Sequence, residues 1–180
     1  MPAKTDCLFT IRYITKQIDF MSEEILKITG EVANPRALTY GDLTAIQSEH
    51  QIPDVSQVEP SRTGGAVWLE GLLKEVGVTD RAQFLGLHSS YDDFHASIPL
   101  AEVRSRGFVI YQMNGESLPR EKGGPVRFFI RDHASCKTDE VDECANVKFV
   151  DHIELTAEKG YDNRPEDEDE HEKLHERQQH

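Results

Sequence analysis

The sequence predicts a mixed α+β domain that is rich in strands and contains only short helices. Segments in which apolar and polar residues alternate outnumber segments with helical periodicity. The helical segments are short and scattered among the strands, which favours an α+β domain over a doubly wound parallel sheet. The length of 180 residues suits one domain. We expect residues 1–160 to form it, followed by an acidic, histidine-containing tail, 161–180, that is either a solvated helix or disordered.

The first half of the chain is expected to begin with strands and end in a long loop. Apolar residues recur near period two between residues 8 and 32, and 33–36 is a turn signal. Thr39 is expected to cap a short helix, because Asp42 stands at the capping-box position three residues later. Residues 47–65 are polar and interrupted by prolines and a Gly-Gly pair, which predicts a short strand and a surface loop of the kind that often carries function.

The second half begins with an amphipathic helix and continues mostly as strands. Apolar residues fall on one face over 68–76, and Gly77 stands where a helix commonly ends. A second short helix is expected to start with Ser97 as its cap. Strands are predicted near residues 82–90, 107–113, 125–130 and 147–155, and the strand at 107–113 is expected to end in the turn Asn114–Gly115.

The charge balance argues against partners that bind basic proteins. The net charge is −13, and the tail 161–180 alone holds eight acidic and three basic residues. Such a chain has no general attraction for nucleic acid or anionic membranes, although an anion can bind where several cations converge.

The sequence also lacks the signals of a membrane or secreted protein. No apolar run approaches the roughly 18 residues of a membrane span, and residues 1–17 lack the apolar stretch of a signal peptide. Three cysteines, an odd number, do not suggest a disulfide framework. We therefore expect a cytoplasmic protein with mostly free thiols.

Several short blocks between residues 25 and 156 occur in the order and spacing of a known enzyme family. The most specific block is Met-Asn-Gly-Glu-Ser-Leu-Pro at 113–119, followed by Gly-Gly-Pro-Val-Arg at 123–127. The other blocks are residues 28–32, 34–35, 38–43, 68–73, 91–100 and 146–154. Together they resemble the molybdopterin-binding domain of sulfite-oxidase-type oxidoreductases, which implies the strand-rich, mixed α+β fold of that domain.

The resemblance also implies a cofactor and residues that contact it. The family binds a pterin cofactor through backbone groups and scattered cations, because Arg and Lys neutralise its phosphate. Arg127 falls on the family's cofactor-contacting arginine, and Lys148 on a lysine beside the cofactor. Lys122 falls near the position of a family histidine. Arg62 lies in the loop that would face the cofactor, as a further anion contact or an exposed loop cation. His88 is expected near the pocket, as a contact or as a structural histidine.

One departure from the family concerns the metal. The family carries molybdenum on the pterin dithiolene and one cysteine thiolate, a soft ligand that suits a sulfur-held metal. That cysteine lies in the loop before the helix at 68–76, yet residues 53–65 contain no cysteine. Ser56 and Gln57 are the nearest candidates. Either the cofactor binds without a protein–metal bond, or another residue ligates the metal, or the fold serves another task.

The cysteines elsewhere suggest a separate, weaker metal site. Cys136 and Cys144, with His133 nearby, offer the thiolate and imidazole donors that zinc prefers. A disulfide or two unpaired thiols are the alternatives. His171 and His175 would share one face of a helix, or simply belong to a polar tail.

The sequence as a whole predicts a molybdopterin-dependent oxidoreductase-like domain. The expected reaction is an oxygen-atom or other two-electron transfer on a small polar substrate, with the pterin or a small anion as ligand. The alternative is a non-catalytic binding or scaffold protein on the same fold that has lost the molybdenum ligand.

Overall fold

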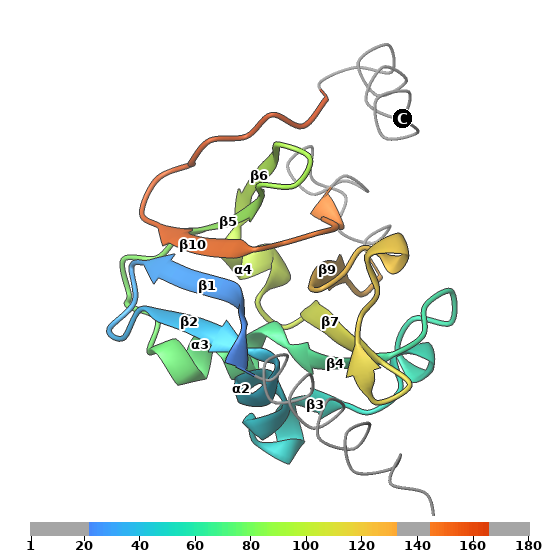
Figure 1. Cartoon of the computed structure of the whole chain (residues 1–180). Helices are drawn as coiled ribbons and strands as arrows, with labels where there is room; N and C mark the ends of the chain where they lie inside the picture. The colour runs from blue at the N-terminus through green and yellow to red at the C-terminus, as the bar shows by residue number, and fades with distance from the viewer. Residues whose placement is uncertain (1–21, 133–144, 166–180) are drawn as a thin grey trace, which may run out of the picture.

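Two β-sheets lie on opposite sides of a shared core in the computed structural model of the chain (Figure 1). The structure describes residues 22–132 and 145–165. Strands predominate and the helices are few and short, so the predicted mixed α+β class is confirmed. The strand expected before residue 22 lies outside the described residues.

The first sheet joins the two ends of the described chain. Its order is β2-β1-β10-β5-β6. β1 pairs in parallel with β10, and the remaining pairs are antiparallel. β10 therefore closes the sheet between two strands that are far from it in sequence (Figure 1). The strands are β1 (Glu24–Gly30), β2 (Arg36–Thr39), β5 (Phe84–Ser89), β6 (Phe94–Pro99) and β10 (His152–Thr156).

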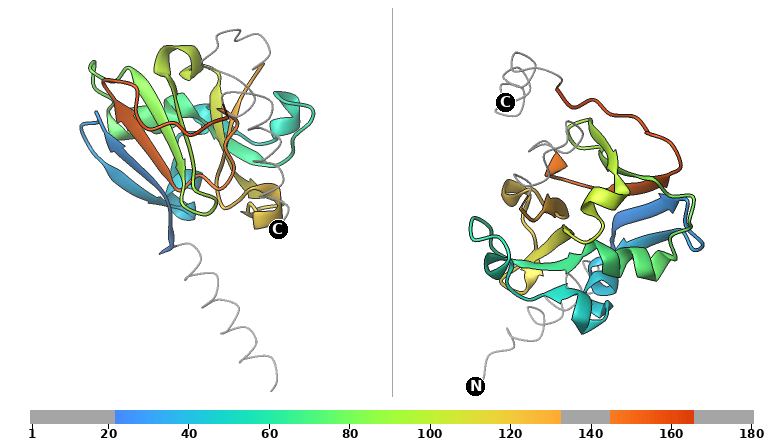
Figure 2. Two further views of the ribbon diagram at one scale, coloured as in Figure 1. Left: turned by 90° about the horizontal axis from the view of Figure 1, so that it is seen from above. Right: turned by 180° about the vertical axis from the view of Figure 1, so that it is seen from behind.

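The second sheet is built around β7 (Gly107–Met113), which pairs with three other strands. The sheet order is β3-β4-β7-β8, and β9 also pairs with β7. Figure 2 shows the ribbon from above and from behind. Asn114 and Gly115 join β7 to β8, and both have positive φ, as a type I′ hairpin turn requires. The Asn-Gly turn predicted from sequence is confirmed. The other strands are β3 (Gln51–Ile52), β4 (Gly65–Trp68), β8 (Glu116–Ser117) and β9 (Arg127–Ile130).

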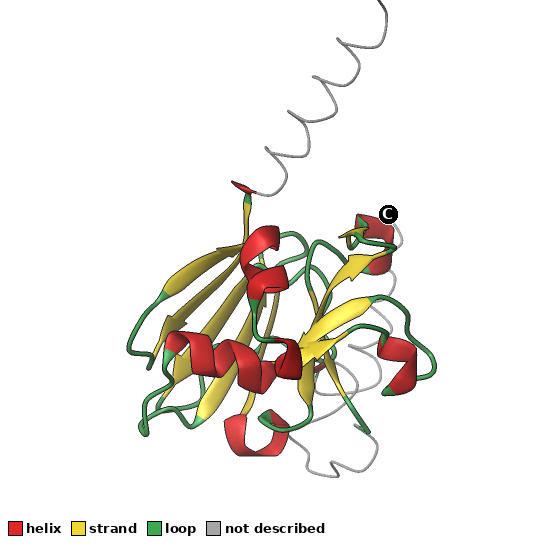
Figure 3. Ribbon diagram, turned by 90° about the horizontal axis from the view of Figure 1, so that it is seen from below, coloured by secondary structure: helices red, strands yellow, loops and turns green. Residues whose placement is uncertain are grey.

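The helices are short and are set around the two groups of strands (Figure 3). Thr39 and Asp42 form the predicted capping box at the start of α2. α3 ends at Gly77, whose φ of 64° is left-handed, as predicted. Within the described ranges, no helix is long and apolar enough to cross a membrane. The helical segments are α2 (Tyr40–Ala45), α3 (Leu69–Val76), α4 (Leu100–Val103) and the 3-10 turns η1 (Ser48–His50), η2 (Val55–Gln57) and η3 (Arg120–Lys122).

The core has two parts, and the smaller one anchors the long loop. The larger cluster lies between the two sheets and includes Leu26, Val109 and Phe128. The smaller cluster lies on the other face of the second sheet and contains Val55 and Phe129. Val55 is fully buried there. The loop predicted between residues 53 and 65 is therefore held against the second sheet by apolar burial.

The expected helix start at Ser97 is wrong. β6 continues through Pro99, and α4 begins only at Leu100. Ser97 pairs with Gly86 of β5 and is fully buried, and its hydroxyl accepts a hydrogen bond from the backbone N–H of Gly160 at 2.9 Å. Pairing with β5 thus outweighs the local Ser-x-Pro helix signal, because strand formation depends on tertiary context.

Replacing the cap residue of α2 tests the contribution of the capping box. The Thr39→Ala variant loses the side-chain acceptor for the Asp42 N–H, which lies 3.1 Å from the threonine oxygen. We expect the free energy of unfolding in urea to fall by about 1 kcal/mol. The control is Thr44→Ala in the same helix, whose hydroxyl only bonds a backbone carbonyl. An equal loss in both variants would contradict the capping role.

Candidate functional site

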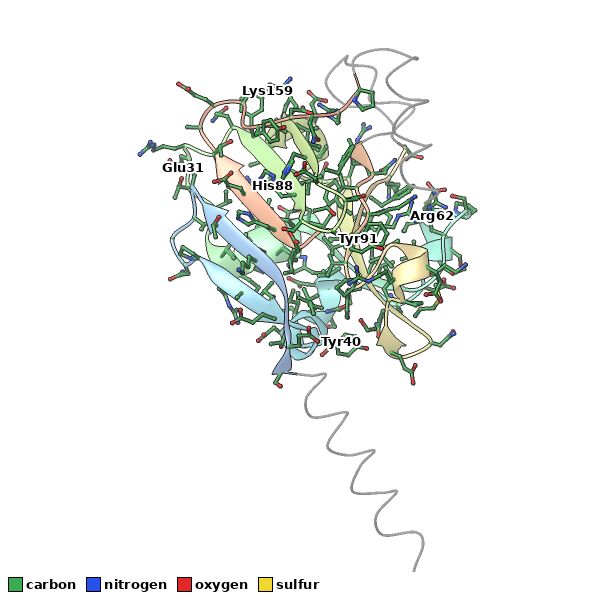
Figure 4. The ribbon with its side chains drawn as sticks, turned by 45° about the horizontal axis from the view of Figure 1, so that its top comes forward. Glu31, Tyr40, Arg62, His88, Tyr91 and Lys159 are labelled. Atoms are coloured by element: carbon green, nitrogen blue, oxygen red, sulfur yellow. The ribbon has the colours of Figure 1, made fainter. Side chains whose placement is uncertain are left out.

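Two arginines from different parts of the chain meet over one face of β9. Arg127 begins β9, and its side chain shares a face with that of Phe129 because strand side chains alternate. Arg62, which is labelled in Figure 4, comes from the loop after η2. Its guanidinium lies 5.1 Å from the centre of the Phe129 ring. The loop held by the smaller core cluster thereby brings Arg62 to Arg127.

Lys148 joins this pair across the backbone of Gly123. A Cβ added at Gly123 would lie 3.1 Å from Cγ of Lys148 and 3.2 Å from Cδ of Arg127. The stems of both cations therefore pack closely against the same glycine. Arg127 Nη1 also donates a hydrogen bond to the carbonyl of Lys122 at 3.4 Å. We call Arg62, Arg127 and Lys148 the cation cluster.

Burial and the neighbouring Arg62 both destabilise the charge of Arg127. Burial, and then the neighbouring Arg62 guanidinium, lower the pKa of Arg127 to about 10. Within the described residues, the Nε atoms of Arg62 and Arg127 are buried and have no hydrogen-bond partner. A buried donor without a partner costs about 1–3 kcal/mol. An anion with several oxygen acceptors would satisfy these donors and offset the repulsion, so the site fits a phosphate-bearing group.

Comparison with known proteins identifies the family. The oxidoreductase molybdopterin-binding domain family matches residues 15–163. The chain belongs to this family. No curated protein matches the chain.

The fold is also shared with a solved structure of the same kind. The chain is similar to a sulfane dehydrogenase, SoxCD from Paracoccus pantotrophus, with a TM-score of 0.55 and 19% sequence identity. The similarity covers 74% of this chain and 38% of the dehydrogenase chain, so this chain spans less than half of that protein's length. At this identity, the likeness supports the fold alone. The predicted sulfite-oxidase-type molybdopterin-binding fold is thereby confirmed.

The loop that carries the family's metal ligand is occupied by hydrogen bonds among its own residues. Asp54 caps η2 by accepting from the backbone N–H of Ser56 at 3.0 Å. The Ser56 hydroxyl donates to the same carboxylate at 2.8 Å. Gln57 is exposed. Residues 53–65 contain no thiol, so this loop provides nothing that fits a thiolate-bound molybdenum.

The other predicted cofactor contacts lie differently. Lys122 contributes its backbone carbonyl to Arg127, and its side chain is exposed. His88 lies on the first sheet, where the strand register places it between His152 of β10 and His95 of β6. The ring centres of both neighbours are 5.1 Å from that of His88. The structure thus places His88 among histidines of the first sheet, and its described contacts do not include the cation cluster.

His88 and His95 contact each other, and each also contacts a carboxylate. Nδ1 of His88 lies 2.9 Å from Nδ1 of His95, a distance that requires a proton on one of the two nitrogens. Nε2 of His88 lies 3.6 Å from Glu154, and Nε2 of His95 lies 3.2 Å from Asp93. Burial, and then the neighbouring His152 and His95, lower the pKa of His88 against the opposing effect of Glu154. Burial and the two neighbouring histidines therefore favour the neutral form of His88.

The alternative metal ligands lie outside the described residues. This applies to Cys136, Cys144 and His133, and to His171 and His175 of the tail. Within residues 22–132 and 145–165, no group of three or more His, Cys, Asp and Glu side chains is arranged to hold a metal ion.

Two glycines beside the cation cluster have a structural role that the sequence patterns did not predict. The Gly123–Gly124 pair belongs to the block that carries the family resemblance. Gly123 has a φ of 92° and supports the stems of Arg127 and Lys148. At Gly124, an added Cβ would overlap the carbonyl oxygen of Leu118. Gly123 is therefore favoured by its left-handed backbone, and Gly124 is required by the close approach of Leu118, which a Gly-Gly pair before a strand can indicate.

The lowered pKa of His88 predicts a pH dependence of stability. The unfolded chain takes up a proton near pH 6.5, whereas folded His88 takes it up only at lower pH. Stability from this group is therefore fully present above pH 6.5 and declines as the pH falls through the interval down to the folded pKa. We expect His88→Gln to reduce the loss of unfolding free energy between pH 7.5 and 5.5 in urea titrations. The control His50→Gln should retain the full loss, and an identical profile for both variants would contradict the assignment.

Proposed function

We propose that the cation cluster binds the phosphate-bearing part of the family's pterin cofactor. The observation that carries this proposal is the pair of buried Nε donors on Arg62 and Arg127, which have no hydrogen-bond partner among the described residues. Guanidinium groups suit phosphate oxygens because they present planar, fixed donors. Lys148 adds a third cation beside the same glycine.

The charge distribution supports binding of an anion at this place rather than over the surface. The whole chain carries a net charge of −13, which repels anions at long range. The cluster nevertheless places two guanidinium groups close enough that one lowers the pKa of the other. Maintaining like charges in a partly buried position costs free energy, which a bound dianion would recover.

The cofactor would determine the chemistry, and the chain would hold it. When bound, it would supply oxygen-atom or other two-electron transfer for a small polar substrate. Arg62, Arg127 and Lys148 would hold the phosphate and keep the cofactor in register with the loop 53–65. Because this loop provides no thiolate, we propose that the cofactor is held through its pterin and phosphate alone.

A second candidate function is binding without catalysis. The observation that favours it is the same loop, where Ser56 is engaged with Asp54 instead of facing the site as a ligand. On this alternative, the domain carries or stores an anionic pterin and lacks the metal. The two candidates share the cation cluster and differ in whether the isolated protein contains molybdenum.

Purification from a host that makes the molybdenum cofactor tests both candidates. We expect the wild-type protein to carry a pterin, detected by the fluorescence of its oxidised form after release. The Arg127→Met variant keeps an apolar stem but loses the charge. Its pterin fluorescence should be at least about tenfold lower than that of wild type, which corresponds to about 1.4 kcal/mol of binding free energy. The control is Arg81→Met, because the Arg81 side chain is 76% exposed and its ion pair in the described residues is with Glu31.

The metal content of the same preparations separates the candidates. Molybdenum in proportion to the pterin supports the oxidoreductase, and pterin without molybdenum supports the binding protein. Well-folded wild-type protein with neither would overturn the proposal.

The ligand-free protein should show the cost of keeping the cluster charged. We expect Arg62→Met to raise the free energy of unfolding by on the order of 1 kcal/mol, because it removes a partly buried charge that repels Arg127. The same variant should bind pterin more weakly. Urea titration of pterin-free protein measures the first effect, with Arg81→Met as the neutral control. A destabilised Arg62→Met would show that the charge is already compensated.

A further inference from the structure

Three side chains contact one another in a row beside the cation cluster: Arg120, Tyr91 and Phe149, which we call the stack. Tyr91 lies in the turn between β5 and β6, and 60% of it is exposed. Its ring centre lies 4.6 Å from that of Phe149, the residue after Lys148. The guanidinium of Arg120, in η3, lies 4.3 Å from the centre of the ring of Tyr91, the residue labelled in Figure 4. The stack therefore joins the first sheet to the segment that contains Gly123.

The backbone at Phe149 is strained, and its ring belongs to the stack. Phe149 has a φ of 55°, a left-handed conformation that costs free energy for a bulky residue and persists only when the surroundings impose it. Its N–H donates to the carbonyl of Gly123 at 2.8 Å. This hydrogen bond and the ring contact with Tyr91 are two restraints that hold the turn.

The same turn determines where Lys148 lies. With Phe149 left-handed, the Phe149 ring points to Tyr91 while the stem of Lys148 rests against Gly123, next to Arg127. Relaxation of Phe149 to a right-handed or extended conformation would change both directions at once. The position of one cation of the cluster thus depends on a ring contact outside the cluster.

We propose that Tyr91 is a positioning residue, which acts through Phe149 to keep Lys148 beside Arg127 in the anion site. The inference rests on the proposed function in that the cation cluster is the ligand site. The contact requires an aromatic ring, since both the Arg120 guanidinium and the Phe149 ring interact with its π-system. The phenol hydroxyl is not required.

The first arm of the test measures the position of Lys148 without any ligand. In wild-type protein, we expect nuclear Overhauser contacts between the α protons of Gly123 and the side-chain methylenes of Lys148. Tyr91→Ala should lose them and Tyr91→Phe should keep them. Tyr161→Ala is the matched control, because Tyr161 is the other large exposed aromatic residue of the described chain, at 65%. Contacts retained in Tyr91→Ala would overturn the inference.

The second arm uses inorganic phosphate as the probe, followed through the Nε–H resonances of Arg62 and Arg127. We expect Tyr91→Ala to raise the phosphate dissociation constant about tenfold, with Tyr91→Phe and Tyr161→Ala within about twofold of wild type. If the wild-type Nε–H resonances do not shift when phosphate is added, the result counts against the anion site. The first arm still decides the role of Tyr91. If Tyr91→Ala and wild type bind phosphate with equal affinity, the role of Tyr91 is overturned and the anion site is not. Matched melting temperatures exclude general destabilisation, and Tyr91→Leu replaces any variant that fails to fold.

Discussion

The site depends on two guanidinium groups that are kept side by side and partly out of water without a counter-charge among the described residues. Arg62 and Arg127 each have a buried Nε that finds no acceptor there, and their proximity lowers the pKa of Arg127 to about 10. A folded chain tolerates such an arrangement only where the rest of the structure over-determines it, which is a property of binding sites prepared for a ligand.

Several separate parts of the fold hold the cations of the cluster in place. The buried Val55 holds the loop of Arg62 against the second sheet, and the ladder between β7 and β9 holds Arg127. Gly123 lets two side-chain stems approach the same backbone, and the Phe149 turn directs Lys148 toward it. Each cation therefore comes from a different segment and is held by a different interaction, which makes the cluster a product of the whole domain.

The chain belongs to the molybdopterin-binding family, but its loop 53–65 does not provide the metal ligand that the family uses. The cations provide what a phosphate needs, whereas the loop lacks the thiolate that a molybdenum centre uses. The loop is nevertheless ordered by its own hydrogen bonds, because Asp54 accepts from the backbone N–H and the hydroxyl of Ser56 at the start of η2. On the proposed function, the chain would bind the phosphate of the cofactor without supplying a thiolate to the metal.

Local signals predicted what local interactions control. The capping box of Thr39, the end of α3 at Gly77 and the Asn114–Gly115 turn were all predicted, since each depends on residues within a few positions. β2 and β4 were missed and the helix at Ser97 was wrong, because these segments owe their conformation to strands that are distant in sequence.

The sequence by itself determined the fold class and pointed to Arg127, Lys148 and Arg62 through a family pattern. Only the tertiary structure decided that these cations share the surroundings of Gly123, whereas His88 belongs to a row of histidines on the other sheet. The physical reason is that a charge's partners are set by distances through space, and strand pairing sets those distances between residues far apart in the chain.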